Sequence, residues 1–231
     1  MKNAKKGLLI VFEGIDGTGK STQLSLLAAT LRQHGLEVIE TREPTMGQFG
    51  RQIRALYTNR NGVSPEQELE LFLADRREHV QNLLMPALEE GKIVLCDRYF
   101  LSTAAYQGCL GDAGRASTSP GSSDTQPSLA CGFTPSEIIG KNSFAPNPDL
   151  ALLFFLSPQA GIQRITTGRG DILNDFEHEA ALERVAAIFD SLQLPYIHRV
   201  DASGSIESVS QSVMRAVRPL LFPLDQNGEV S

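Results

Sequence analysis

Short apolar segments alternate with longer amphipathic segments along most of the 231-residue chain. The first apolar segment, Leu8 to Phe12, is continuous and rich in branched side chains, which is typical of a parallel strand buried on both faces. Comparable segments follow at intervals, and together they predict five strands, at 8–12, 36–40, 92–96, 149–156 and 196–200.

The segments between these strands predict helices from their apolar spacing and their end signals. Leu24, Leu27, Ala28 and Leu31 share one helical face, and Gly35 ends that helix. Ser64-Pro65-Glu66-Gln67 opens a long helix, with serine as N-cap and glutamine at the capping-box position, that ends before Gly91. Further helices are expected at 47–57, from Tyr99 through Tyr106, from 134 onward, at 177–192 and at about 205–221. One more begins after Ser157-Pro158 and continues until Gly168-Arg169-Gly170 interrupts the pattern.

This alternation of strands and helices implies a mostly parallel sheet covered on both faces. Without any visible internal repeat, the sequence predicts a single three-layer α/β/α domain over residues 1–231 with a five-stranded sheet. Residues 111–128 contain mainly Gly, Ser, Thr, Pro and Asp, and this composition predicts a mobile surface loop.

Composition and charge restrict the classes of partner. Hydrophobic residues make up 41% of the chain and charged residues 21%, as in ordinary soluble domains. Lys and Arg total 21 against 27 Asp and Glu, a formal net charge of -6, which argues against a broad nucleic-acid surface. A few positioned arginines can still hold a small anion in an acidic protein.

The apolar segments and the cysteines predict a cytoplasmic location. The run from Gly7 to Phe12 is too short for a signal peptide, and no run approaches the ~18 apolar residues of a membrane span. Cys96, Cys109 and Cys131 are an odd number without C-x-x-C spacing, so we expect reduced thiols and neither a disulfide framework nor a zinc site.

A glycine-rich segment between the first strand and the first helix carries the clearest chemical signal. Gly14-x-x-x-x-Gly19-Lys20-Ser21 matches the phosphate-loop pattern without a mismatch. Glycines allow positive φ and turn backbone N–H groups inward, while the helix N-terminus adds its positive end. Lys20 can reach the β- and γ-phosphates and the Ser21 hydroxyl can ligate Mg²⁺. The expected ATP-binding residues are Gly14, Ile15, Asp16, Gly17, Thr18, Gly19, Lys20, Ser21 and Thr22.

Three further features concern the phosphoryl acceptor. Asp97-Arg98-Tyr99 follows the third strand, where open α/β sheets place ligands, so Asp97 can serve a magnesium shell and Arg98 can bind a phosphate. Phe72 and Arg76 lie four residues apart on one helical face, where an aromatic plane and a guanidinium can meet a flat base. The charged cluster Thr41-Arg-Glu-Pro44 follows the second strand.

These residues leave several functions open. A kinase for a nucleoside monophosphate, a kinase for a deoxynucleoside and a GTPase-like switch all use a phosphate loop. The absence of an Asn-Lys-x-Asp guanine motif weakens the switch interpretation.

Four motifs in order resemble those of bacterial thymidylate kinases. They are Phe12-Glu-Gly-Ile-Asp-Gly-Thr-Gly-Lys-Ser-Thr22, Thr41-Arg-Glu-Pro44, Leu71-Phe-Leu-Ala-Asp-Arg-Arg-Glu-His79 and Cys96-Asp-Arg-Tyr-Phe-Leu-Ser-Thr-Ala-Ala-Tyr-Gln-Gly108. With Pro148-Asp149 the resemblance spans most of residues 7–220. It implies a P-loop kinase fold with a small lid, a homodimer, and transfer of phosphate from ATP to dTMP with Mg²⁺, which supplies dTTP for DNA replication.

The resemblance also implies roles for individual residues. Phe72 would stack on thymine, Arg76 would bond its carbonyl edge, and Tyr106 would press on the deoxyribose. Arg54 and Arg98 would hold the dTMP phosphate. Asp16 and Glu43 would serve the sugar hydroxyl or the water shell of magnesium. The implied dTMP-binding residues are Glu43, Arg54, Phe72, Arg76, Arg98, Ser102, Thr103, Tyr106 and Gln107.

The chain departs from this family pattern at two segments. The segment 109–133 is longer and richer in Ser, Pro and Gly than the corresponding segment of the family usually is. The lid, about 164–177, has Asn174-Asp175-Phe176-Glu177 where an Asp-Arg pair is usual. Arg164 and Arg169 are therefore the lid candidates that would join Lys20, Arg98 and Asp16 as catalytic residues. Arg169 is favoured because it lies between two glycines, at a tip that could swing onto the ATP phosphates, whereas Arg164 lies on a helix and reaches less freely.

Overall fold

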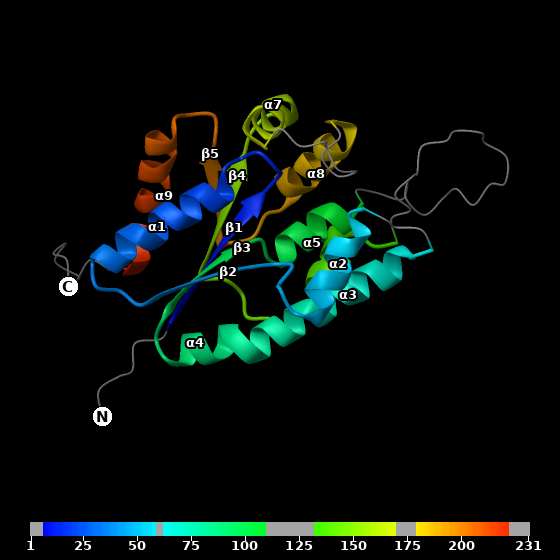
Figure 1. Ribbon diagram of the computed structural model, residues 1–231, viewed down its shortest axis with the longest axis horizontal. Helices are drawn as coiled ribbons and strands as arrows, with labels where there is room; N and C mark the ends of the chain where they lie inside the picture. The colour runs from blue at the N-terminus through cyan, green and yellow to red at the C-terminus, as the bar shows by residue number, and fades with distance from the viewer. Residues whose placement is uncertain (1–6, 59–61, 110–131, 170–178, 222–231) are drawn as a thin grey trace.

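The computed structural model describes residues 7–58, 62–109, 132–169 and 179–221 (Figure 1). The predicted mobile loop at 111–128 and the greater part of the lid, from residue 170 onward, lie outside these ranges.

The strands form a single five-stranded sheet in the order β2-β3-β1-β4-β5, and every pairing is parallel. The predicted five-stranded α/β fold is thus confirmed. Each strand lies within two residues of its predicted start: β1 (Leu8–Gly14), β2 (Val38–Arg42), β3 (Ile93–Asp97), β4 (Leu150–Phe155) and β5 (Ile197–Asp201).

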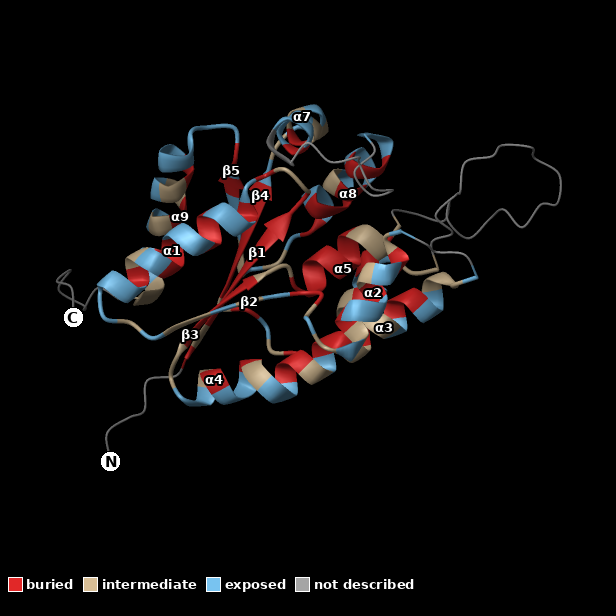
Figure 2. Cartoon of the chain, in the orientation of Figure 1, coloured by how far each residue is buried: buried red, intermediate tan, exposed pale blue. Residues whose placement is uncertain are grey.

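Two hydrophobic cores lie on opposite faces of this sheet (Figures 1 and 2). Successive side chains of a strand point to opposite faces, so Leu9 and Val11 of β1 join one core while Ile10 and Phe12 join the other. The first core is covered by α5, α8 and the continuation of the long helix beyond α3, and the second by α1 and α9. Their bounds are α1 (Lys20–Gln33), α3 (Pro65–His79), α5 (Phe100–Gln107), α8 (Glu179–Ser191) and α9 (Ile206–Leu221).

The predicted long helix is continuous but changes its winding. Its start has the expected capping box, in which Ser64 Oγ accepts from the Gln67 amide at 3.2 Å and Gln67 Oε1 accepts from the Ser64 amide at 2.9 Å. After α3 comes a π-helical turn, η1 (Val80–Leu84), and then α4 (Met85–Glu89). The wider turn ends two residues before Pro86, whose ring would clash with a carbonyl group one α-helical turn earlier.

The remaining helices are α2 (Gln48–Leu56), α6 (Pro135–Lys141) and α7 (Pro158–Arg169). The segment Gly168-Arg169-Gly170 was predicted to interrupt the helical pattern, and α7 is described as far as Arg169 within it. A single helical glycine costs only about 1 kcal/mol, which neighbouring helical residues can offset.

The prediction of uniformly reduced cysteines is also wrong. Cys96 is a free, buried thiol, whereas Cys109 is disulfide-bonded. Spacing in sequence does not reveal which cysteines approach within bonding distance in space. Among the helices that the structure describes, none is both long and apolar enough to cross a membrane.

Candidate active site

The phosphate loop joins the carboxyl end of β1 to the N-terminus of α1. Gly14, Gly17 and Gly19 have φ of 131°, 80° and 84°, the left-handed region that side chains disfavour. Space is also limiting, since a Cβ on Gly14 would lie 2.2 Å from the carbonyl oxygen of Phe154. The motif glycines are therefore required by this backbone and not merely tolerated.

Lys20 is held inside this loop. Its Nζ donates to the Ile15 carbonyl at 2.8 Å and lies 3.4 Å from Thr18 Oγ1, and the residue is only 6% exposed. Burial and the charge of Arg98 lower the pKa of Lys20 to about 8, although nearby carboxylates oppose the shift. The ammonium group is thus poorly solvated and attracts an entering phosphate strongly.

Arg98 and Asp16 form a charged pair between the segment after β3 and the phosphate loop. Arg98 Nη2 donates to Asp16 Oδ1 at 2.6 Å, and the Tyr106 hydroxyl donates to Asp16 Oδ2 at 3.0 Å. Burial acts to raise the pKa of Asp16, but Arg98 and Lys20 outweigh it and lower that pKa to about 2. Asp16 is therefore ionised throughout the neutral range and orients the arginine.

A third group converges on Arg76, which is 1% exposed. Its Nε donates to Glu43 Oε2 at 2.8 Å, its Nη2 to Thr103 Oγ1 at 2.9 Å, and its Nη1 to Asn142 Oδ1 at 2.5 Å. His79 Nδ1 lies 2.9 Å from Glu43 Oε1. This network fixes the guanidinium orientation before any ligand arrives.

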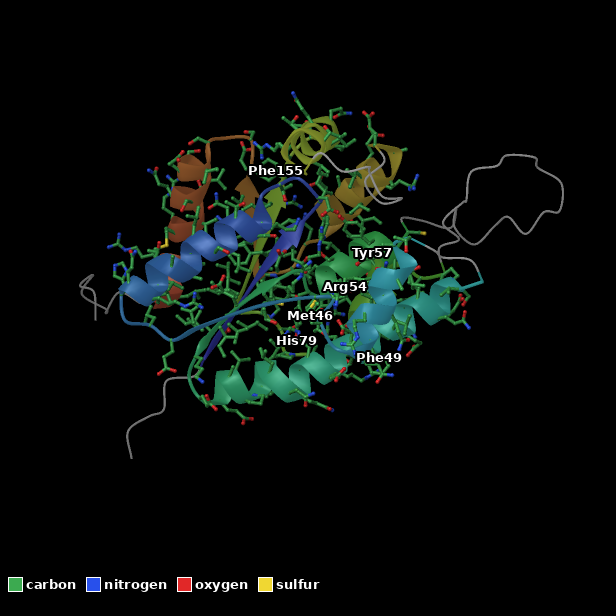
Figure 3. All side chains as sticks on the ribbon, viewed as in Figure 1. Met46, Phe49, Arg54, Tyr57, His79 and Phe155 are labelled. Carbon is green, nitrogen blue, oxygen red and sulfur yellow. The ribbon has the colours of Figure 1, made fainter. Side chains whose placement is uncertain are left out.

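Arg54 is positioned by the loop after β2. Its Nη1 donates to the Pro44 carbonyl at 2.8 Å and its Nη2 to the Thr45 carbonyl. Asp75 holds this loop by accepting from the Thr45 amide at 2.8 Å and from Thr45 Oγ1 at 2.6 Å. Figure 3 shows Arg54 and Tyr57 at the end of α2 that faces α5.

One cavity of about 930 Å³ runs from the phosphate loop to the face of α3 that carries Phe72 and Arg76. It brings together the greater part of the predicted site. The predicted residues that line it are Asp16, Gly17, Thr18, Gly19, Lys20, Ser21, Thr22, Glu43, Arg54, Phe72, Arg76, Asp97, Arg98, Ser102, Thr103, Tyr106, Gln107 and Arg164.

Three predicted residues are absent from this lining. Gly14 and Ile15 contribute backbone beneath the loop, where Ile15 is 2% exposed and its carbonyl binds Lys20. The side chain of Arg169 falls outside the part of the chain that the structure describes.

Several residues that line the cavity were not among the predicted site residues. Tyr57 lies one helical turn beyond Arg54, so the helical spacing of an aromatic and a cation could have indicated it. Arg42 ends β2, and a further group follows β5. Open α/β sheets bind ligands at the carboxyl ends of their strands, and this rule could have indicated both. That group comprises Ala202, Gly204, Ser205, Ile206 and Val209.

The predicted magnesium residues meet at the phosphate-loop end of the cavity. Ser21 Oγ donates to Asp97 Oδ2 at 2.5 Å, so two oxygen ligands from distant segments lie side by side. No group of three or more acidic, histidine or cysteine side chains that could hold a metal occurs within the described ranges. Two oxygens fit Mg²⁺ that arrives on nucleotide phosphates and keeps several waters.

Glu13 predicts a pH dependence of folding stability. Burial raises the pKa of its carboxyl group from 4.5 to about 7, although the hydrogen bond from Ser102 and the charges of Arg98 and Arg76 lower it. Between these values the folded chain binds more protons than the unfolded chain, so this group's contribution to stability falls as pH rises and is lost above about pH 7. In urea unfolding, the free energy of unfolding of the wild type should fall by up to about 3 kcal/mol between about pH 5 and about pH 8 because of this group, and Glu13→Gln should remove that fall. If the unfolding free energies of the wild type and Glu13→Gln changed with pH in parallel, this prediction would be contradicted.

The chain has a phosphate loop at the end of β1 of an all-parallel sheet, and one cavity extends from this loop to a buried arginine and an aromatic ring. These features define a P-loop nucleotide-binding protein with room for a second ligand. A family model described as Thymidylate kinase matches residues 12–119. The chain belongs to the thymidylate kinase family.

Relatives support this membership over nearly the whole chain. It is 51% identical to a thymidylate kinase of Desulfotalea psychrophila over 215 residues, which cover 93% of this chain and 96% of that protein. It is 45% identical to a thymidylate kinase of Xanthomonas campestris over 204 residues, covering 88% and 79%, and 43% identical to one of Xanthomonas oryzae over the same shares.

Proposed function

We propose that this chain transfers the γ-phosphoryl group of ATP to dTMP with Mg²⁺, forming ADP and dTDP for dTTP synthesis. The observation that carries the proposal is the single cavity that joins the phosphate loop to the Phe72–Arg76 face in a member of the thymidylate kinase family. A phosphotransferase needs both substrates in one space, and a cavity of about 930 Å³ has room for them.

ATP would occupy the end formed by the phosphate loop and the segment after β5. The loop amides and Lys20 would bind the β- and γ-phosphates, and the adenine would lie toward Ala202, Ile206 and Val209. Ser21 and Asp97 would hold Mg²⁺, partly through water. The metal would neutralise charge on the phosphates.

dTMP would occupy the opposite end. Phe72 offers an aromatic face for the base, and Arg76, fixed by Glu43, Thr103 and Asn142, offers a cation at its edge. Arg54 and Arg98 would bind its phosphate, while Ser102, Tyr106 and Gln107 would complete the pocket.

The transfer needs no covalent intermediate, because the attacking phosphate is already anionic and both substrates are held in line. The chain's contribution is position and charge: Lys20 and Arg98 face the region where the phosphates meet, and a lid arginine would add a further cation. Exclusion of water would suppress ATP hydrolysis.

We also propose that the chain works as a homodimer in the cytoplasm. Apolar side chains remain on the outside of several helices, including Met85 at 39% and Leu26 at 38% exposed, and a second copy could cover such faces. Light scattering at micromolar concentration tests the dimer, and a monomer mass would refute it.

Substrate choice provides the test of function. With ATP in a coupled ADP assay, kcat/KM for dTMP should exceed that for AMP or GMP by at least about 10²-fold, because Phe72 and Arg76 form a pocket for one pyrimidine. Faster turnover of AMP or GMP would refute the base assignment. Turnover of thymidine would indicate a nucleoside kinase, and GTP hydrolysis without any acceptor would indicate a switch protein.

A further inference from the structure

Glu13 is a carboxylate in the interior of the sheet that the proposed reaction does not use. It follows Phe12 in β1 and is 0% exposed. Alternation along β1 places it on the same face as Leu9 and Val11, the face that α5 covers. It does not line the cavity. A buried acid at this position needs a compensating role, because burial of an unpaired carboxylate is costly.

The contacts of Glu13 all lead to the segment that carries Arg98. Glu13 Oε1 accepts from the Tyr99 amide at 3.0 Å, and Oε2 accepts from the Ser102 hydroxyl. Ser102 Oγ in turn accepts from Arg98 Nη1 at 3.2 Å. The result is a chain of hydrogen bonds from the guanidinium through the serine to the carboxylate.

This arrangement replaces a helix cap that the local sequence lacks. Tyr99 is the N-cap residue of α5 and makes no side-chain capping bond, whereas α3 and α6 begin with complete capping boxes. In a capping box the third helical residue accepts from the N-cap amide. In α5 that residue is Ser102, and Glu13 from the neighbouring strand accepts from the amide instead.

The same contacts stabilise an unfavourable backbone conformation. Arg98 has φ of 68°, and it is the non-glycine residue with positive φ in the described chain. Such a conformation is retained where surrounding bonds over-determine it. On one side the Arg98 amide donates to the Phe12 carbonyl at 2.9 Å, and on the other the next amide, that of Tyr99, donates to Glu13.

We propose that Glu13 is a positioning residue for the acceptor phosphate: through Tyr99 and Ser102 it holds Arg98 in the orientation that binds the phosphate of dTMP. The inference deepens the proposed function and rests on it. It is specific to the phosphate, because the Phe72–Arg76 end of the cavity receives its own bonds from Glu43, Thr103 and Asn142.

The charges around Glu13 explain why glutamine is not an adequate replacement. The titratable groups that face it come from several elements: the cations Arg98, Arg76 and Lys20, and the neutral side chains of Cys96, Tyr99 and Tyr196. A glutamine oxygen could still accept from the Tyr99 amide. Its NH₂ group would face Ser102 Oγ as a donor, in competition with Arg98. Above about pH 7, where the Glu13 carboxyl group is ionised, the substitution would also remove the negative charge that attracts Arg98.

The test compares two ligands that differ only in the phosphate. By calorimetry, Glu13→Gln should weaken dTMP binding about tenfold while thymidine binding changes less than about twofold. Glu13→Asp, which keeps the charge, should fall between the wild type and Glu13→Gln and replaces it if that variant does not fold. An equal loss for both ligands, or tighter dTMP binding, would overturn the proposal.

A double-mutant cycle separates positioning from a general structural effect. In an Arg98→Ala background, Glu13→Gln should change dTMP affinity less than about twofold, since the residue through which it acts is gone. The same factor in both backgrounds would overturn the inference. Asp149→Asn is the matched control, because Asp149 also accepts a backbone amide, from Leu9 at 2.8 Å, but before β4 at the opposite end of the sheet. It should leave the ratio of dTMP to thymidine affinity unchanged.

The outcome can be distinguished from failure of the proposed function. If the wild-type protein does not phosphorylate dTMP, the function itself is refuted. If it does, and Glu13→Gln retains the wild-type ratio of dTMP to thymidine affinity, only the role of Glu13 is refuted.

Discussion

Replacement of Lys20 by alanine is expected to lower kcat for dTMP phosphorylation by about 10³-fold. Lys20 is the cation inside the phosphate loop, where the β- and γ-phosphates would sit, and its Nζ donates to the Ile15 carbonyl at 2.8 Å. Removal of that charge leaves the developing negative charge on the phosphates less stabilised in a poorly solvated site. Steady-state kinetics with saturating ATP and dTMP measure the loss.

The control for this variant is Lys92→Ala. Lys92 precedes β3, at the end of the strand opposite to Asp97 and the cavity, and it pairs with Glu90. Its removal should therefore change kcat less than about twofold. Circular dichroism and thermal unfolding should show that both variants are folded. Near-normal turnover by a folded Lys20→Ala protein would remove Lys20 from the mechanism.

The second large effect is expected at the lid. Arg164→Ala should lower kcat by at least about 10²-fold with little change in the Michaelis constant for dTMP. Arg164 lies on α7 and lines the cavity, and α7 packs against the phosphate loop, where a Cβ on Gly17 would lie 2.3 Å from the Gly161 carbonyl oxygen. A cation on this helix can therefore reach a phosphoryl group in transfer.

Arg169 provides the paired comparison. The position of Arg169 between two glycines predicts this role for it, and that prediction stays open because the structure does not describe its side chain. If Arg169→Ala loses more kcat than Arg164→Ala, the assignment moves to Arg169. Wild-type kcat in both variants would mean that the lid works without an arginine.

Local features of this protein were predictable because they depend on neighbouring residues. The capping boxes at Ser64 and Thr134 satisfy amides within three residues of the cap. The phosphate loop needs glycine at fixed positions, whatever the rest of the fold. Strand segments were also recognisable, since a strand buried on both faces needs a run of apolar side chains wherever it pairs.

Pairings between distant segments were not predictable in the same way. The strand order places β1 between β3 and β4, and only this order brings Glu13 beneath Tyr99 and Ser102. His79 likewise gave no metal or catalytic pattern in the sequence, yet it lies 2.9 Å from Glu43, thirty-six residues away along the chain.

By itself, the sequence determined the succession of strands and helices, the phosphate loop and the family, because each follows from short-range spacing or from motifs in order. The tertiary structure decided how Arg76 and Arg98 are oriented, that the segment after β5 completes the cavity, and that Cys109 is bonded. The physical reason is that a buried charge is fixed by whichever polar groups the packed elements bring within hydrogen-bond distance, and that set is not encoded by its neighbours in the chain.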